Sequence, residues 1–179
     1  MRQPRLSDRI RMKAATGANF SRCRRYRYTL WRRWDTDGPM VMIMGLNPST
    51  ADAHRNDPTI RRCIGFARNW GYGGLVVTNL FAFRATYPAD LKSAVDPMGP
   101  RNDYWIRRMA GQVETIVAAW GNDGAWAGRS ALVQRMLRGR LHCLRINAGG
   151  EPAHPLYLPA CLAPRPWPNG QESPMHEQS

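Results

Sequence analysis

Short polar stretches follow the apolar runs of this sequence, and their residue types suit them to binding a ligand. The stretch "MVMIMGLNPSTAD" places Asn47 and Ser49 directly after an apolar run that stops on a glycine. Asn79 lies at the end of a second apolar run, and His154 precedes a proline in a later segment. Because ligands of open α/β sheets bind at the carboxyl ends of the strands, these positions predict a site at that edge.

The elements that must position these residues are visible as alternating apolar runs and helical patterns. Strands are predicted at residues 26–33, 40–45, 75–80, 115–120 and 141–146. Helices are predicted at residues 58–70, 101–111 and 126–138. The last four strand candidates are short and mostly apolar, which is typical of strands buried in a parallel sheet. Asp57 and Pro58 form an N-cap and first-turn pair at the start of the first helix.

This order of elements predicts the fold class. Strands that alternate with helices of this length form βαβ crossovers. We expect an α/β fold of three layers, with a central, mostly parallel four-stranded sheet and residues 26–33 as an N-terminal edge strand. The expected domain spans residues 21–163. A basic arm at residues 1–20 precedes it, and a tail at residues 164–179, whose composition is typical of disorder, follows it.

Charge is concentrated near the N-terminus. The chain has 26 lysine and arginine residues against 13 acids, which gives a net charge of +13. Residues 1–33 contain eleven of the basic residues and one acid, Asp8. A basic balance of this size indicates a nucleic acid or a nucleotide as the partner.

The segment "SRCRRYRYTLWRR" interleaves arginines with aromatic residues, a mixture that neutralises phosphates and stacks on bases. It predicts DNA-binding roles for Arg24, Arg25 and Arg27. A solubilising arm that leads into an edge strand is one alternative, and a transit segment at residues 2–15 is a weaker one.

Several classes of protein are disfavoured by composition. The four cysteines are scattered without a C-x-x-C pair, which argues against a zinc site or a disulfide framework. No apolar run approaches the roughly 18 residues of a membrane span, and no secretory signal is present. We expect a cytoplasmic monomer that has no membrane partner and needs no cofactor.

Four motifs, taken in order, resemble a known enzyme superfamily. They are "GLNPS" at residues 45–49, "VVTNLFAFR" at 76–84, "TIVAAWG" at 115–121 and "AHPLYLP" at 153–159. Together they resemble the uracil-DNA glycosylase superfamily, in particular the G-x-N-P form of its mismatch-specific uracil and thymine enzymes. The strings "NPSTAD", "NDPTIRRC", "RNWGYGG" and "HPLYLPA" also look like an uncharacterised bacterial and phage domain family, a likeness that supplies no mechanism.

The resemblance implies a DNA glycosylase that hydrolyses the N-glycosidic bond of a damaged or modified pyrimidine flipped out of DNA. Its role would be base-excision repair or defence against phages with modified bases. Asn47, whose amide is no strong base, would orient the attacking water, and neutral His154 would donate to the departing base. Asn79 would pair with the Watson–Crick edge of the base, and Phe81 or Phe83 would stack on it.

Two departures from the superfamily pattern carry information. Strict uracil enzymes in the resemblance have a tyrosine where this chain has Ser49, so a base-binding pocket with Ser49 is expected to admit a 5-substituted pyrimidine. The "HPLYL" string lacks the usual Ser-Pro before its apolar wedge. The wedge that enters DNA could therefore be Leu156, Tyr157 or Leu158.

Two other classes remain open from the sequence. Asp52, His54, Asp57 and Asp103 together suggest a divalent-metal site in a nucleotide hydrolase. Helix capping already accounts for Asp57, and "PRNDYW" is typical of a helix start, so no metal ligand is assigned. A non-catalytic nucleic-acid-binding module with a vestigial pocket is the third possibility.

Overall fold

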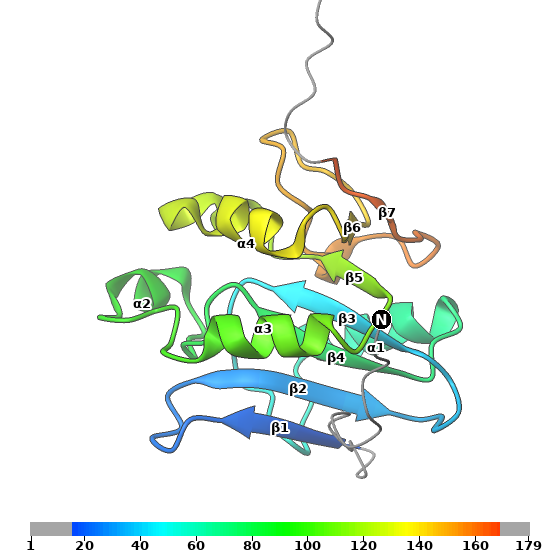
Figure 1. The fold of residues 1–179 in the computed structure, drawn as a ribbon, viewed down its shortest axis with the longest axis horizontal. Helices are drawn as coiled ribbons and strands as arrows, with labels where there is room; N and C mark the ends of the chain where they lie inside the picture. Colours follow the sequence, from blue (N-terminus) through cyan, green and yellow to red (C-terminus); the bar gives the residue numbers. More distant parts are fainter. Residues whose placement is uncertain (1–15, 169–179) are drawn as a thin grey trace, which may run out of the picture.

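The computed structural model describes residues 16–168, which form one mixed α/β unit around a seven-stranded sheet. The strand order across the sheet is β1-β2-β4-β3-β5-β6-β7 (Figure 1). The strands are β1 (Thr16–Phe20), β2 (Arg27–Arg33), β3 (Met40–Gly45), β4 (Gly74–Asn79), β5 (Thr115–Ala118), β6 (Leu141–Cys143) and β7 (Arg165–Pro166). The helices are α1 (Pro58–Asn69), α2 (Pro88–Ser93), α3 (Asn102–Ala110) and α4 (Arg129–Leu137), with short 3-10 helices η2 (Asn122–Gly128) and η3 (Pro155–Tyr157).

The four central strands are parallel, as the sequence predicts. β3 pairs with β4 on one side and with β5 on the other, and β5 pairs with β6. Their register places Gly45 beside Asn79 and Met44 beside Ala118, so β3, β4 and β5 end at one edge of the sheet. Apolar side chains on both faces explain the continuous apolar runs.

The outer strands differ from the prediction. β2 is not an edge strand, because β1 pairs antiparallel with its outer side while β4 pairs antiparallel with its inner side. β1 consists of "TGANF", which lacks apolar alternation and falls within the expected arm. Gly17 allows this pairing, because a Cβ at that position would stand 2.0 Å from the Trp31 ring.

At the other end of the sheet, the described chain continues past the expected boundary at residue 163. β7 pairs antiparallel with β6, and Trp167 is buried against Trp120 with ring centroids 5.4 Å apart. The expectation of a disordered tail from residue 164 is therefore wrong for residues 164–168. Residues 1–15 of the expected arm and 169–179 of the tail lie outside the described residues.

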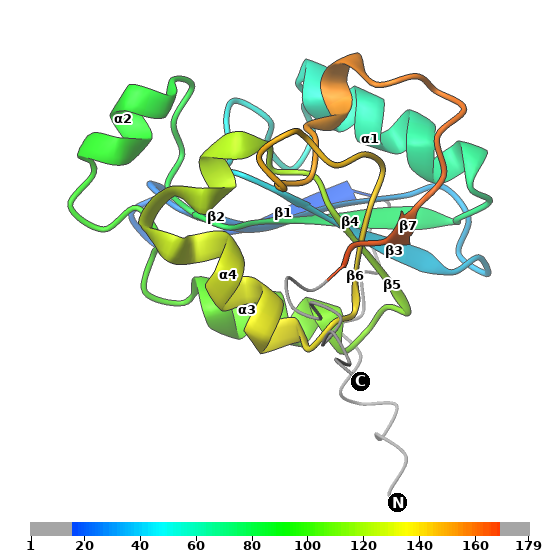
Figure 2. The same cartoon turned by 90° about the horizontal axis from the view of Figure 1, so that it is seen from above.

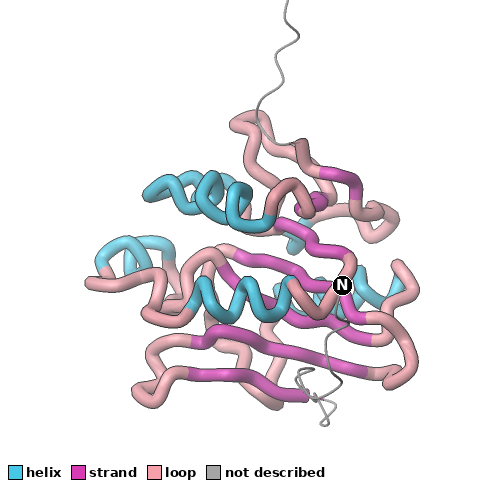
Figure 3. The backbone as a smooth tube through the Cα atoms, in the orientation of Figure 1, coloured by secondary structure: helices cyan, strands magenta, loops and turns pink. Residues whose placement is uncertain are grey.

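Helices lie on both faces of the sheet (Figures 2 and 3). α1 packs over the face that carries Val41 and Ile43 of β3, and α3 and α4 pack over the face that carries Met42 and Met44. The three expected helices are present with ends shifted by up to three residues, and the short α2 was not expected. None of the helices within residues 16–168 is long and apolar enough to cross a membrane.

Candidate functional site

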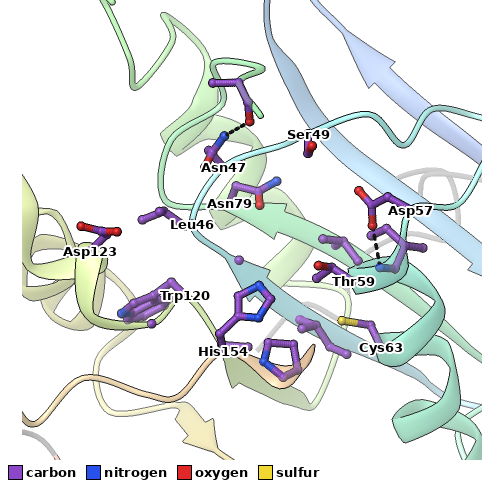
Figure 4. A pocket seen from close by; sticks show the side chains of 18 of the residues that line it. Leu46, Asn47, Ser49, Asp57, Thr59, Cys63, Asn79, Trp120, Asp123 and His154 are labelled. Carbon is purple, nitrogen blue, oxygen red and sulfur yellow. Dashed lines mark hydrogen bonds between the residues drawn. The ribbon is translucent and has the colours of Figure 1, made fainter. Parts of the chain in front are cut away.

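A cavity of about 390 Å³ opens at the edge where β3, β4 and β5 end (Figure 4). The loop after β3 forms one wall, and the start of α1 and the segment entering η3 form another. Asn47, Ser49, Asn79 and His154 all line it. The structure thus brings together three separate segments of the sequence: the loop after β3 with Asn47 and Ser49, the end of β4 with Asn79, and the start of η3 with His154.

Asn47 is oriented by the backbone around it. Its Nδ2 donates to the carbonyl oxygens of Pro48 at 3.0 Å and Ala85 at 2.8 Å. Only the amide nitrogen can donate to two carbonyls, so these contacts determine which way the amide faces. The Oδ1 is thereby left as an acceptor beside the cavity, a position suited to holding a water molecule.

Asn79 presents the opposite chemistry. It is 3% exposed, and its Nδ2 has no hydrogen-bond partner among the residues that the structure describes. Gly45 makes room for it, because a Cβ on Gly45 would stand 2.8 Å from Asn79 Oδ1. Asn102 braces the end of the strand by donating to the carbonyls of Asn79 and Leu80 at 2.9 and 3.0 Å. A buried donor without a partner favours a ligand that supplies an acceptor.

His154 has a defined tautomer when it is neutral. Its Nδ1 accepts from the backbone N–H of Leu156 at 3.3 Å, so the proton of the neutral ring is on Nε2. The imidazole faces the cavity (Figure 4). His154 is exposed at its outer side, yet partial desolvation lowers its pKa below the ordinary value of 6.5, and the Asp57 carboxylate partly opposes this. The side chain is therefore a neutral Nε2–H donor at pH 7.

The prediction that Phe81 lines the base-binding site is wrong. Phe81 is 2% exposed and packs in the core against Trp126, with ring centroids 5.1 Å apart, and it does not line the cavity. Trp120 is equally buried at 2% exposed, but it is the aromatic residue that lines the cavity. Its Nε1 donates to Glu151 Oε2 at 2.6 Å, which holds the ring in place. The available sequence signal was its position just before the glycine that ends "TIVAAWG".

Arg27 was predicted to contact DNA phosphates from the surface, and this prediction does not fit its position in the structure. Arg27 is 2% exposed and lines the cavity, and its Nη1 donates to the Ala51 carbonyl at 2.7 Å. Because β2 is antiparallel to β4, its first residue lies at the edge where β4 ends. The register between β1 and β2 shifts at this end of β2, and Arg27 is buried there, whereas Arg24 and Arg25 in the preceding turn are exposed.

The surface beside the cavity contains both charge and an exposed aromatic ring. Arg24 and Arg25 lie near the same edge, where the Arg25 carbonyl accepts from the Arg84 N–H at 2.9 Å. Beyond His154, Tyr157 is 91% exposed, Leu156 is half-buried and Leu158 is buried in the core. Burial removes Leu158 from the three wedge candidates and makes Tyr157 the most accessible.

The acids that suggested a metal site have separate local roles. Asp52 Oδ1 accepts from the N–H groups of His54 and Arg55, and these hydrogen bonds lower the pKa of Asp52. Asp57 caps α1 by accepting from Ile60 N at 2.8 Å, while Asp103 pairs with a buried arginine of α4. Within residues 16–168, no three His, Cys, Asp or Glu side chains are grouped as metal ligands.

The cavity also contains Asp123 and Cys63, which the sequence did not predict, and Asp57, which was predicted only as a helix cap and a possible metal ligand. Asp123 is paired with Lys92 at 2.9 Å. Cys63 lines the cavity, but burial raises the pKa of this thiol to about 12, so no thiolate nucleophile is available at neutral pH. The cavity therefore offers amides, an imidazole, a buried guanidinium and two carboxylates, of which Asp57 caps α1 and Asp123 is paired with Lys92, and this set suits recognition of a polar heterocycle.

Comparison with known proteins identifies a protein family but no biochemical activity. The family model that matches the chain covers residues 27–156 and is described as a protein of unknown function (DUF1643). Neither the curated proteins nor the solved structures contain a match.

Proposed function

The chain belongs to this family of unknown function, DUF1643, and because that description names no activity, we propose from the site that the protein is a DNA glycosylase. It would hydrolyse the N-glycosidic bond of a modified pyrimidine that has been flipped out of DNA. The observation that carries the proposal is the meeting of Asn47, Asn79 and His154 in one cavity at the carboxyl ends of parallel strands. These are the residues to which the glycosylase resemblance of the sequence assigns roles.

The hydrogen-bonding states of the three side chains match the reaction. Breaking the bond develops positive charge on the sugar and negative charge on the departing base. The free Oδ1 of Asn47 would hold a water molecule, and the Nε2–H of neutral His154 would donate to the base oxygen that gains charge. The unpartnered Nδ2 of Asn79 would pair with an acceptor on the base edge. Trp120 would provide the wall against which the base packs.

The proposed partner is DNA, bound across the cavity mouth by a single copy of the chain. Arg24 and Arg25 would contact phosphates, and Tyr157 would be the wedge that fills the space left by the flipped nucleotide. In this proposal the helices on both sheet faces and the parallel centre correspond to the three-layer arrangement of the glycosylases.

A panel of oligonucleotides tests the activity. Each contains one modified pyrimidine, in single-stranded or duplex form, and alkali after incubation reveals abasic sites. Asn47→Ala should retain DNA affinity and lose at least about tenfold in single-turnover base release, the equivalent of roughly 1.4 kcal/mol in barrier. Asn69→Ala is the matched control, because Asn69 is exposed on α1 and does not line the cavity.

The same experiment separates the proposal from its alternatives. Release that requires an added divalent cation would favour the metal-dependent hydrolase. DNA binding without release from any member of the panel would favour a non-catalytic module. An unchanged rate in Asn47→Ala would remove this residue from the mechanism.

A further inference from the structure

Two donors in the cavity wall are buried without a hydrogen-bond partner in the described chain: Nδ2 of Asn79 and Nε of Arg27. The proposed function uses the first and leaves the second unexplained. Arg27 is tied to the Ser49 side of the cavity, because its Nη1 donates to the carbonyl of Ala51, two residues after Ser49.

Another buried arginine of β2 shows what a purely structural role looks like. Arg32 is 5% exposed and uses its nitrogens on four acceptors, the Asn56 side chain and the carbonyls of Trp31, Asp52 and Arg55. It does not line the cavity. The Arg27 side chain, by contrast, donates one hydrogen bond, to the Ala51 carbonyl, and its Nε has no partner within the described residues.

Arg27 also lacks a carboxylate in contact. The two ion pairs within residues 16–168 join Lys92 to Asp123 and Arg129 to Asp103. Asp57 and Asp52 act on Arg27 only at longer range, and the nearby guanidinium groups of Arg84 and Arg32 oppose them. Burial is the main cause that lowers the pKa of Arg27 to about 10, so the group stays cationic at neutral pH. A buried cation without a paired anion is costly unless a ligand supplies one.

We propose that Arg27 is a specificity-determining residue that donates to an anionic group at the 5-position of the pyrimidine, with a carboxylate as the simplest case. This rests on the proposed function and on the expectation from the sequence that the small Ser49 leaves space at the 5-position. A methyl group there would fill the space and leave the guanidinium unpaired. A carboxylate would fill it and accept charge-assisted hydrogen bonds from Arg27.

Calorimetric titration with free bases tests the pocket apart from catalysis. The probes are uracil, thymine and 5-carboxyuracil, added to the full-length protein. The wild type should bind 5-carboxyuracil at least about tenfold more tightly than thymine, the scale expected for one charge-assisted pairing. Arg27→Gln should bring this ratio close to one, whereas Arg32→Gln should leave it unchanged.

The methyl ester of 5-carboxyuracil, which removes the negative charge, keeps the test decisive if Arg27→Gln does not fold. The wild type should bind this ester about as weakly as thymine. Equal affinity for thymine and 5-carboxyuracil would overturn the role of Arg27, even if the protein releases bases from oligonucleotides. A clear preference for 5-carboxyuracil without base release would support the role of Arg27 and overturn the glycosylase activity.

Discussion

At the scale of single residues, the cavity is lined by polar side chains that each have a hydrogen-bonding group available for a ligand. Asn47 Nδ2 donates to two backbone carbonyls, so its Oδ1 remains available as an acceptor, while Asn79 Nδ2 remains available as a donor. His154 Nδ1 accepts from the Leu156 N–H, so Nε2 remains available for a ligand. Asn47 and His154 are each oriented by a neighbouring backbone group, which reduces the reorganisation needed when a ligand binds.

Ser49 gives the sharpest residue-scale prediction about substrate class. Ser49→Tyr should fill the space beside Pro48 and lower the release of a 5-substituted pyrimidine more than the release of uracil, which has only hydrogen at that position. Release rates should be compared on single-stranded and duplex oligonucleotides. This comparison separates differences in the free energy of base flipping from differences in the fit of the base to the pocket. Equal losses on both bases would mean that Ser49 does not face the 5-position.

His154 gives a prediction about pH and stability. Because its pKa is lowered in the folded state, the unfolded chain binds a proton first as the pH falls below the ordinary histidine value of 6.5. The free energy of unfolding should then decrease as the pH falls toward the folded-state pKa, and the contribution should be constant below it. Urea unfolding at about pH 7.5 and about pH 5.5 measures this change. In His154→Gln the decrease should be smaller, and an equal decrease in both proteins would contradict the assignment.

At the scale of elements, the edge strands decide where the folded unit ends. β7 is only two residues long, but it brings Trp167 against Trp120, a wall of the cavity. The Trp167 Nε1 also donates to the Gly150 carbonyl at 3.2 Å. The C-terminal segment is therefore coupled to the site through one aromatic contact.

Trp167→Ala should lower the free energy of unfolding by about 3 kcal/mol, the usual scale for removing a buried large aromatic side chain. Equilibrium urea denaturation measures the loss, and Pro168→Ala, at an exposed neighbouring position, is the control. A loss within about 0.5 kcal/mol, as for a typical surface substitution, would show that Trp167 does not stabilise the sheet.

At the scale of the whole molecule, charge is distributed unevenly over the chain. Residues 1–15 contain five lysine and arginine residues and one acid. The described residues begin at β1, so a deletion that tests the arm must stop before Thr16 to preserve the β1–β2 pair.

Deletion of residues 1–15 should weaken DNA binding by a similar factor for all sequences and reduce its dependence on salt. The slope of log affinity against log salt should fall by about 0.9 for each duplex phosphate contact that is lost. Fluorescence anisotropy with two unrelated duplexes over a range of salt concentrations measures both effects. Equal slopes in the two proteins would reduce the arm to a solubilising segment.

The sequence by itself determined the parallel centre of the fold and the polar residues at its carboxyl edge. Local patterns suffice for this, because a buried parallel strand must be apolar on both faces and the polar residues directly after it must reach the edge. Asn47, Ser49 and Asn79 could be predicted in this way, and His154 through the motif order.

Only the tertiary structure decided which side chains line the cavity and which are buried elsewhere. Phe81 follows Asn79 by two residues but packs in the core, and Arg27 lies three residues after the exposed Arg24 but turns inward. Trp120 and Arg27 reach the cavity from strands on opposite sides of β3 and β4. The physical reason is that the burial of a side chain depends on which distant strands and helices cover it, and no local pattern in one chain segment contains that information.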